Sequence, residues 1–128
     1  MKVDHSHVFV KNFEKNLEFL SKTLKFPVVG VPVDRNLNLR LLRVGPDLIE
    51  LVDEKQFPRK CKTALLVDNI EKELGELRKK GAEVAEMTEI SVAKWREGEF
   101  RYVLLRMIGD EKFDGDWVEL VEKGEWKP

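Results

Sequence analysis

An internal repeat constrains the fold of this chain more than any other feature. Residues 10–20 (VKNFEKNLEFL) align without a gap with residues 67–77 (VDNIEKELGEL), sharing Val, Asn, Glu, Lys and two Leu. Further along, residues 48–52 (LIELV) resemble residues 117–121 (WVELV). The first pair is 57 residues apart and the second 69, so the later copy carries 12 extra residues. Self-similarity of this kind indicates one supersecondary unit built twice.

Each copy is expected to begin with a strand that runs into a helix. Asn12 and Asn69 stand at matching positions, where an asparagine side chain can accept a hydrogen bond from the free amides of a first turn. Gly81 is a suitable residue for ending the second helix. Apolar residues at helical spacing, with charged residues between them, predict two amphipathic helices: Phe13, Leu17, Leu20 and Leu24 in the first, and Ile70, Leu74 and Leu77 in the second.

Three strands are predicted after each helix. Turn residues separate them, including Gly45-Pro46-Asp47, Gly98 and Asp114-Gly115. The predicted class is therefore α+β, with two repeated βαβββ modules at about 1–54 and 61–123, a linker at about 55–60, and a single domain over residues 1–128. The strands are expected at about Val28–Val33, Leu37–Val44 and Leu48–Val52, and then at about Glu83–Ile90, Phe100–Ile108 and Trp117–Glu122.

Strand alternation sorts the side chains of these strands onto two faces. Apolar residues such as Ile49, Leu51 and Leu120 should pack under the helices. The opposite face should then be a curved surface around a polar cavity, with Glu50 and Glu119 as equivalent residues of the two modules. That face collects His5, His7, Glu50, Lys62, Trp117 and Glu119.

These features resemble the vicinal oxygen chelate superfamily, which includes glyoxalase I, bleomycin-resistance proteins, methylmalonyl-CoA epimerase and extradiol dioxygenases. The resemblance covers about the full length and rests on the repeated strand–helix start and the repeated terminal glutamate. It implies an eight-stranded curved sheet with a cleft, helices on the outer face, a small-molecule ligand and a homodimer.

Metal-dependent members of this superfamily bind a divalent cation through residues early in each first strand and a glutamate in each last strand. The resemblance places His5, Glu50 and Glu119 at three of these positions and Lys62 at the fourth. An ammonium group has no lone pair for a metal, so this ligand set is incomplete. His7 shares a strand face with His5 and could complete it. Zinc, iron, manganese, nickel and cobalt all suit such ligands, and a site without metal is the alternative.

Lys62 could have other roles in the site. Its ammonium group could balance the charges of Glu50 and Glu119, hold an anionic ligand, or act as a base if burial lowers its pKa. His7 could contact the ligand directly, and Trp117 could form an apolar cavity wall. If the site merely lacks one ligand, Lys62→His should raise metal affinity at least tenfold.

Two functions fit these residues. One is a metal-dependent lyase, isomerase or dioxygenase that polarises vicinal oxygens of a small substrate, with Glu119 or Glu50 transferring protons. The alternative is a non-catalytic small-molecule-binding protein of the drug-resistance type with a degenerate metal site. The retained His5, Glu50 and Glu119 favour the first function, and Lys62 favours the second.

Composition narrows the setting of the protein. The net charge is −1 and no basic run occurs, so a nucleic-acid partner is not expected. No apolar run approaches the ~20 residues of a membrane span, and no signal peptide is evident, so a cytoplasmic location is expected. The charged fraction is 37%, mostly Lys and Glu, with Gln56 as the sole glutamine, which is typical of thermostable proteins.

Overall fold

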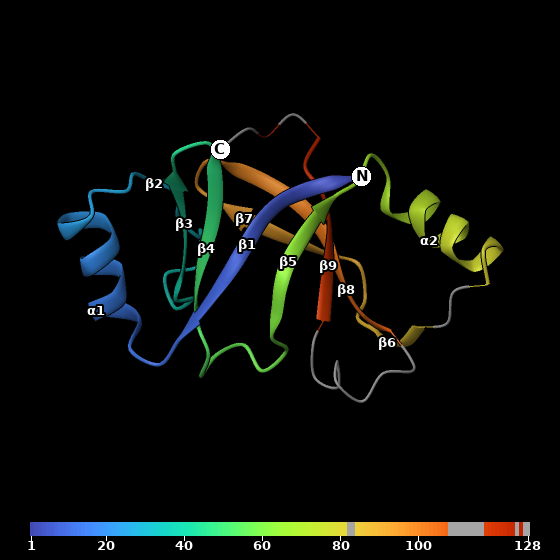
Figure 1. Ribbon diagram of the computed structural model, residues 1–128, viewed down its shortest axis with the longest axis horizontal. Coiled ribbons are helices and arrows are strands. Elements are labelled where there is room, and N and C mark those ends of the chain that lie inside the picture. Colours follow the sequence, from blue (N-terminus) through green and yellow to red (C-terminus); the bar gives the residue numbers. More distant parts are fainter. Residues whose placement is uncertain (82–83, 108–116, 125, 127–128) are drawn as a thin grey trace.

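The computed structural model describes residues 1–81, 84–107, 117–124 and 126. Its elements follow the predicted order of strand, helix and further strands in each half of the chain (Figure 1). They are β1 (Lys2–Val10), α1 (Phe13–Glu18), the π-helical turn η1 (Phe19–Thr23), β2 (Val28–Gly30), β3 (Leu39–Val44), β4 (Asp47–Asp53), β5 (Cys61–Leu66), α2 (Ile70–Lys79), β6 (Val84–Met87), β7 (Ser91–Trp95), β8 (Gly98–Met107) and β9 (Trp117–Glu122).

The strands form one mixed sheet that is not closed into a barrel. Its order is β2-β3-β4-β1-β5-β9-β8-β6, with β7 also paired to β8. The first strand of each half lies at the centre, where β1 and β5 pair antiparallel, and each pairs in parallel with the last strand of its own half. This arrangement confirms the α+β class and brings the ends of both repeats to the middle of the sheet.

Among the described residues, the sheet has nine strands where eight were expected. The difference lies in the second half, where β6 and β7 pair with different parts of the 10-residue strand β8. β7 was not predicted, and it accounts for part of the extra length of the later copy. The predicted turn at Asp114-Gly115 lies outside the described residues.

The predicted helix caps are confirmed. The Asn12 side chain accepts a hydrogen bond from the amide of Lys15 at 3.1 Å, and Asn69 accepts one from Lys72 at 2.8 Å. Gly81 follows α2 with a φ of 75°, as a left-handed helix end requires. Both helices therefore begin directly after the repeated asparagine, which caps them.

Each helix packs against the strands of its own half. Phe13 of α1 packs with Leu42 and Leu51, and Ile70 of α2 packs with Val103 and Leu120. The two helices flank the sheet at opposite ends of the molecule (Figure 1). The predicted assignment of Leu51 and Leu120 to the helix-covered face is confirmed, so the titratable residues of these strands face away from the helices.

A third cluster joins the two halves on the far side of the sheet. Trp95, Phe100 and Trp126 stack with ring centroids 5.3–6.1 Å apart and are buried together with Leu41 and Val121. The chain after β2 also bonds to the end of β7, because the amide of Val33 donates to Lys94 at 3.0 Å and that of Arg96 donates to Val31 at 2.8 Å. These bonds hold the end of β7, in the second half, against the segment that follows β2 in the first half.

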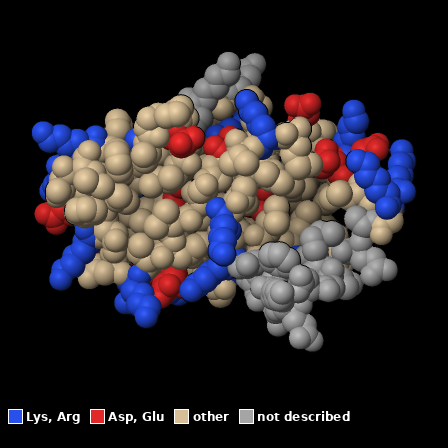
Figure 2. Space-filling model, viewed as in Figure 1, with Lys and Arg blue, Asp and Glu red and all other residues tan. Residues whose placement is uncertain are grey.

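The surface matches the near-neutral charge. On the face shown in Figure 2, Lys and Arg are interspersed with Asp and Glu, and uncharged residues cover most of the middle. Within the described ranges, no helix is long and apolar enough to cross a membrane.

Candidate functional site

Four of the predicted site residues meet at the centre of the sheet. His5 and His7 project from β1, Glu50 from β4 and Glu119 from β9, and the His5, Glu50 and Glu119 side chains are buried. The Nε2 atom of His5 lies 3.2 Å from Oε2 of Glu50 and 3.2 Å from Nε2 of His7. His7 Nε2 lies 3.0 Å from Oε2 of Glu119 and 3.8 Å from Oε2 of Glu50. The residues of both repeats therefore form one cluster.

Lys62 differs from its predicted position, since its side chain is exposed and does not line the cavity. The cause is a β-bulge in β5. Between Cys61 and Ala64 the strand advances three residues while β9 advances two, from Trp117 to Glu119. The extra residue reverses the alternation before the bulge. Cys61 consequently faces the cavity, and Lys62 points away from it.

Trp117 is also placed differently from the expectation of a cavity wall. It is 8% exposed and does not line the cavity that contains Glu50 and Glu119. The guanidinium of Arg59 lies 5.4 Å from the centre of its ring. Trp117 therefore supports Arg59, which does line the cavity.

His5 is held from behind by a carboxylate. Its Nδ1 atom lies 2.6 Å from Oδ2 of Asp4, which also accepts from Nζ of Lys123 at 2.8 Å. Burial alone would lower the pKa of His5, but the hydrogen bonds with Asp4 and Glu50 outweigh it and raise the pKa to about 10. Burial would raise the pKa of Glu50, but the hydrogen bond from His5 holds it below its ordinary value.

The orientation of His5 has a chemical consequence. With Asp4 at Nδ1, the proton of a neutral His5 ring resides on Nδ1 and leaves a lone pair on Nε2. That lone pair faces the Nε2 atom of His7 and a carboxylate oxygen of Glu50. Such a contact is repulsive unless a proton or a cation lies among these atoms. His5 is therefore suited either to carry a second proton or to ligate a metal.

The donor atoms also fit a metal in kind and in spacing. Ligand atoms about 2.0–2.2 Å from a common ion are separated from each other by roughly 3.0–3.5 Å. Four of the six pairs among His5, His7, Glu50 and Glu119 have such atoms 3.0–3.8 Å apart, and Glu119 makes its contact through His7. A carboxylate on the outer nitrogen of a histidine, as Asp4 is on His5, is the usual support for a metal-binding imidazole. His5, His7 and Glu50 therefore fit a divalent cation, and Glu119 lies beside them in a second group that shares His7.

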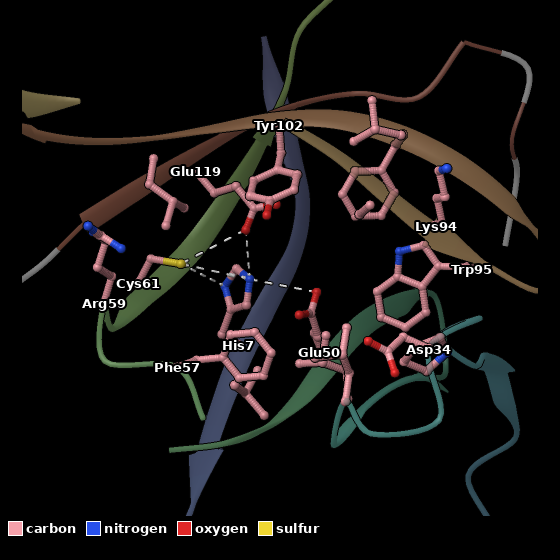
Figure 3. A pocket seen from close by; sticks show the side chains of 18 of the residues that line it. His7, Asp34, Glu50, Phe57, Arg59, Cys61, Lys94, Trp95, Tyr102 and Glu119 are labelled. Atoms are coloured by element: carbon pink, nitrogen blue, oxygen red, sulfur yellow. Dashed lines mark hydrogen bonds and ion pairs between the residues drawn. The ribbon is translucent and has the colours of Figure 1, made fainter. Parts of the chain in front are cut away.

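A cavity of about 410 Å³ opens onto this cluster. His7, Glu50 and Glu119 line it with Cys61, and Tyr102 lies close to Glu119 (Figure 3). His5 does not line the cavity, so it lies behind the other donors. Apolar side chains form most of the remaining wall, and they come from both halves and the linker: Phe9, Leu39, Val52, Phe57, Trp95 and Phe100.

Sequence reasoning missed three residues of this site. Asp4 was overlooked because a bulge in β1 between Val3 and His5 interrupts the alternation there. From the sequence, Cys61 is interpreted as inert because no histidine partner is implied beside it, whereas the bulge in β5 brings its sulfur to 3.6 Å from Nδ1 of His7. Tyr102 lies in β8, where alternation was too uncertain to assign a face. The proximity of Asp4 to His5 in sequence was a usable signal for a supporting carboxylate.

No protein-family model matches this sequence, and no curated protein matches it either. Solved structures do match over nearly the whole chain. A variant of Streptomyces coelicolor methylmalonyl-CoA epimerase, in complex with 2-nitronate-propionyl-CoA, has a TM-score of 0.63 at 18% identity and covers 100% of this chain and 98% of its own. A hypothetical protein of Bacillus halodurans has a TM-score of 0.65 at 21% identity, covering 99% and 97%.

A third match names the superfamily. The glyoxalase/bleomycin resistance protein/dioxygenase superfamily member from Vibrio splendidus has a TM-score of 0.60 at 11% identity and covers 93% of this chain and 96% of its own. This chain has the vicinal oxygen chelate fold. At these identities the likeness concerns the fold, and the activity has to be argued from the residues of the site.

Proposed function

We propose that this protein is a divalent-metal-dependent enzyme of the isomerase or lyase type, acting on a small molecule with vicinal oxygens. The observation that carries the proposal is the contact of His5 Nε2 with His7 and Glu50 at 3.2 Å while Asp4 occupies Nδ1. A cation bound by His5, His7 and Glu50 would satisfy these three donor atoms at once, and Glu119 adjoins them through its contact with His7. When bound, it would polarise the oxygens of the substrate as a Lewis acid.

The residues divide into two roles. His5 is held by Asp4 and does not line the cavity, so it serves as a fixed ligand. Glu50 contacts both histidines, and its lowered pKa keeps it ionised. Glu119 lines the cavity and contacts one of the two histidines, His7. It is therefore better placed than Glu50 to take a proton from a substrate carbon and return it.

The cavity favours a compact substrate. Its apolar walls, including Phe9 and Phe57, would bury the carbon skeleton, and its floor of His7, Glu50 and Glu119 would receive the oxygens. The structure of the epimerase neighbour is a complex with 2-nitronate-propionyl-CoA. Proton transfer beside a carbonyl or carboxylate is therefore the reaction class that we propose to test first.

The decisive experiment is elemental analysis after stepwise dialysis against manganese, iron, cobalt, nickel and zinc. We expect about one metal ion per chain, lost in Glu50→Gln and in His7→Ala. Glu89→Gln is the matched control, because Glu89 is exposed and does not line the cavity. If no metal binds under any condition, the enzyme proposal fails, and the cavity is that of a small-molecule-binding protein.

We also propose a homodimer in solution, as the resemblance implied. Sedimentation velocity of the full chain measures this directly. A monomer at every concentration would contradict the dimer while leaving the metal proposal intact, because all the proposed ligands come from one chain.

A further inference from the structure

Cys61 lies directly beside the proposed metal ligands. Its side chain is unpaired by any disulfide, and the residue is 4% exposed. The Sγ atom is 3.6 Å from Nδ1 and 3.8 Å from Nε2 of His7, and 3.9 Å from Oε2 of Glu119. Figure 3 shows these three side chains pointing toward one another across the cavity floor.

The spacing of these atoms resembles that of ligands around one ion. A sulfur about 2.3 Å and a nitrogen about 2.0–2.1 Å from a tetrahedral ion are roughly 3.6 Å apart. One ligand atom each from His7, Cys61 and Glu119 lies within 4.8 Å of the others, and the same holds for His5, His7 and Glu50. His7 belongs to both groups, so the sulfur adjoins the same donor cluster.

We propose that Cys61 is a metal ligand and that its sulfur makes the site prefer zinc or cobalt to manganese or magnesium. This inference rests on the proposed function. Thiolate is a soft ligand that favours zinc, whereas carboxylate oxygens also suit manganese and magnesium. On binding, the S–H bond breaks and the sulfur–metal bond forms, and the proton passes to the carboxylate of Glu119 and then to solvent. The ion itself undergoes no change of oxidation state.

The bulge in β5 determines which side chain lies beside the proposed ligands. Without the extra residue, alternation would turn Lys62 toward the cavity, and its ammonium group would repel a cation. With the bulge, an uncharged thiol takes that place. With the sulfur as a ligand, the carboxylate of Glu119 would not be needed to hold the ion and would be free to transfer protons.

The test is cobalt loading of the full chain, followed by ultraviolet absorption. We expect a sulfur-to-cobalt charge-transfer band in the natural protein, its loss in Cys61→Ser, and its retention in Lys62→Ser, which changes the adjacent exposed residue. In competition experiments, the preference for zinc over manganese should fall at least tenfold in Cys61→Ser. X-ray absorption at the zinc edge of the natural protein should detect a sulfur neighbour, and this measurement needs no variant to fold.

The outcomes separate the two proposals. Cobalt bound with no charge-transfer band, and zinc bound with no sulfur neighbour, would overturn the role of Cys61 and leave the metal-dependent function standing. No cobalt or zinc bound at all would remove the proposed function together with this inference.

Discussion

The Nε2 atoms of His5 and His7 lie 3.2 Å apart, although the two residues are separated by a full pleat of β1. Their rings are inclined at 65° with centroids 4.7 Å apart, so the edges converge while the ring planes do not stack. Asp4 fixes one ring from behind, and Glu119 contacts the other. One strand thus supplies two convergent imidazoles at the centre of the sheet.

The raised pKa of His5 makes the stability of the metal-free protein depend on pH. The pKa is about 10 in the folded protein, against an ordinary value of 6.5. The charged ring therefore stabilises the fold fully below pH 6.5, and this contribution is lost as the pH rises toward 10. Urea unfolding with a chelator present, at several pH values between 6 and 10, should show the decline.

His5→Gln is the control for that measurement. The unfolding free energy of this variant should fall less over the same pH range, because the contribution of His5 is absent. The decline that remains comes from the ionisation of other groups. An equal decline in both proteins would show that His5 is not the group responsible.

Removing the charge behind His5 should weaken metal binding. Asp4→Asn keeps the shape of the side chain but provides a weaker acceptor for the proton on Nδ1. Loss of such a supporting carboxylate typically costs 10- to 100-fold in affinity, and calorimetric titration with zinc would measure it. Asp47→Asn, at an exposed position at the start of β4, should bind zinc as the natural protein does.

The bulge in β5 changes the outcome expected of Lys62→His. Because Lys62 is exposed, an imidazole there cannot join the donor cluster, and zinc affinity should change less than twofold. A tenfold gain would show that β5 can shift its register to bring residue 62 into the cavity. Calorimetric titration with zinc would measure both affinities. Lys60→His, at another exposed position, is the control variant.

The repeated helix caps should be equivalent in energy. Replacing Asn12 or Asn69 with alanine removes one side-chain hydrogen bond from a first turn, which costs about 1 kcal/mol of unfolding free energy. Chemical denaturation would measure both losses. Asn36→Ala, at an exposed position outside the helices, should cost clearly less.

The ion pairs are consistent with the thermostability predicted from composition. Arg101 bonds both Glu71 of α2 and Glu122 of β9, and Glu122 also accepts from the amide of Ile70 at 2.9 Å. Such networks retain their value at high temperature better than isolated pairs do. Calorimetry should give a melting midpoint above ~65 °C, the upper end of the mesophilic range. A lower midpoint would contradict the prediction.

The repeat and the alternation of the strands predict most of this structure. The Asn caps, the central glutamates and the helix-covered side chains at Leu51 and Leu120 all follow from regular periods. A regular period holds wherever hydrogen bonding between strands is uninterrupted. That is why His5, Glu50 and Glu119 could be assigned to one face from the sequence.

The errors occur where a strand gains one residue. The bulges in β1 and β5 hid Asp4 and exchanged Lys62 for Cys61. Neither bulge contains glycine, so no residue in the sequence marks it. The path of β7 depends on contacts between Trp95 and distant residues such as Trp126, which local patterns do not encode.

The antiparallel pairing of β1 with β5 divides the donor cluster between the two copies of the repeat. The first copy supplies both histidines and Glu50, and the second supplies Cys61 and Glu119. An ancestral single unit would have needed a second chain to complete such a centre, and identical chains would have given identical ligands. Two copies joined in one chain are free of that symmetry. Each copy can therefore carry different side chains, the first its two histidines and the second its thiol.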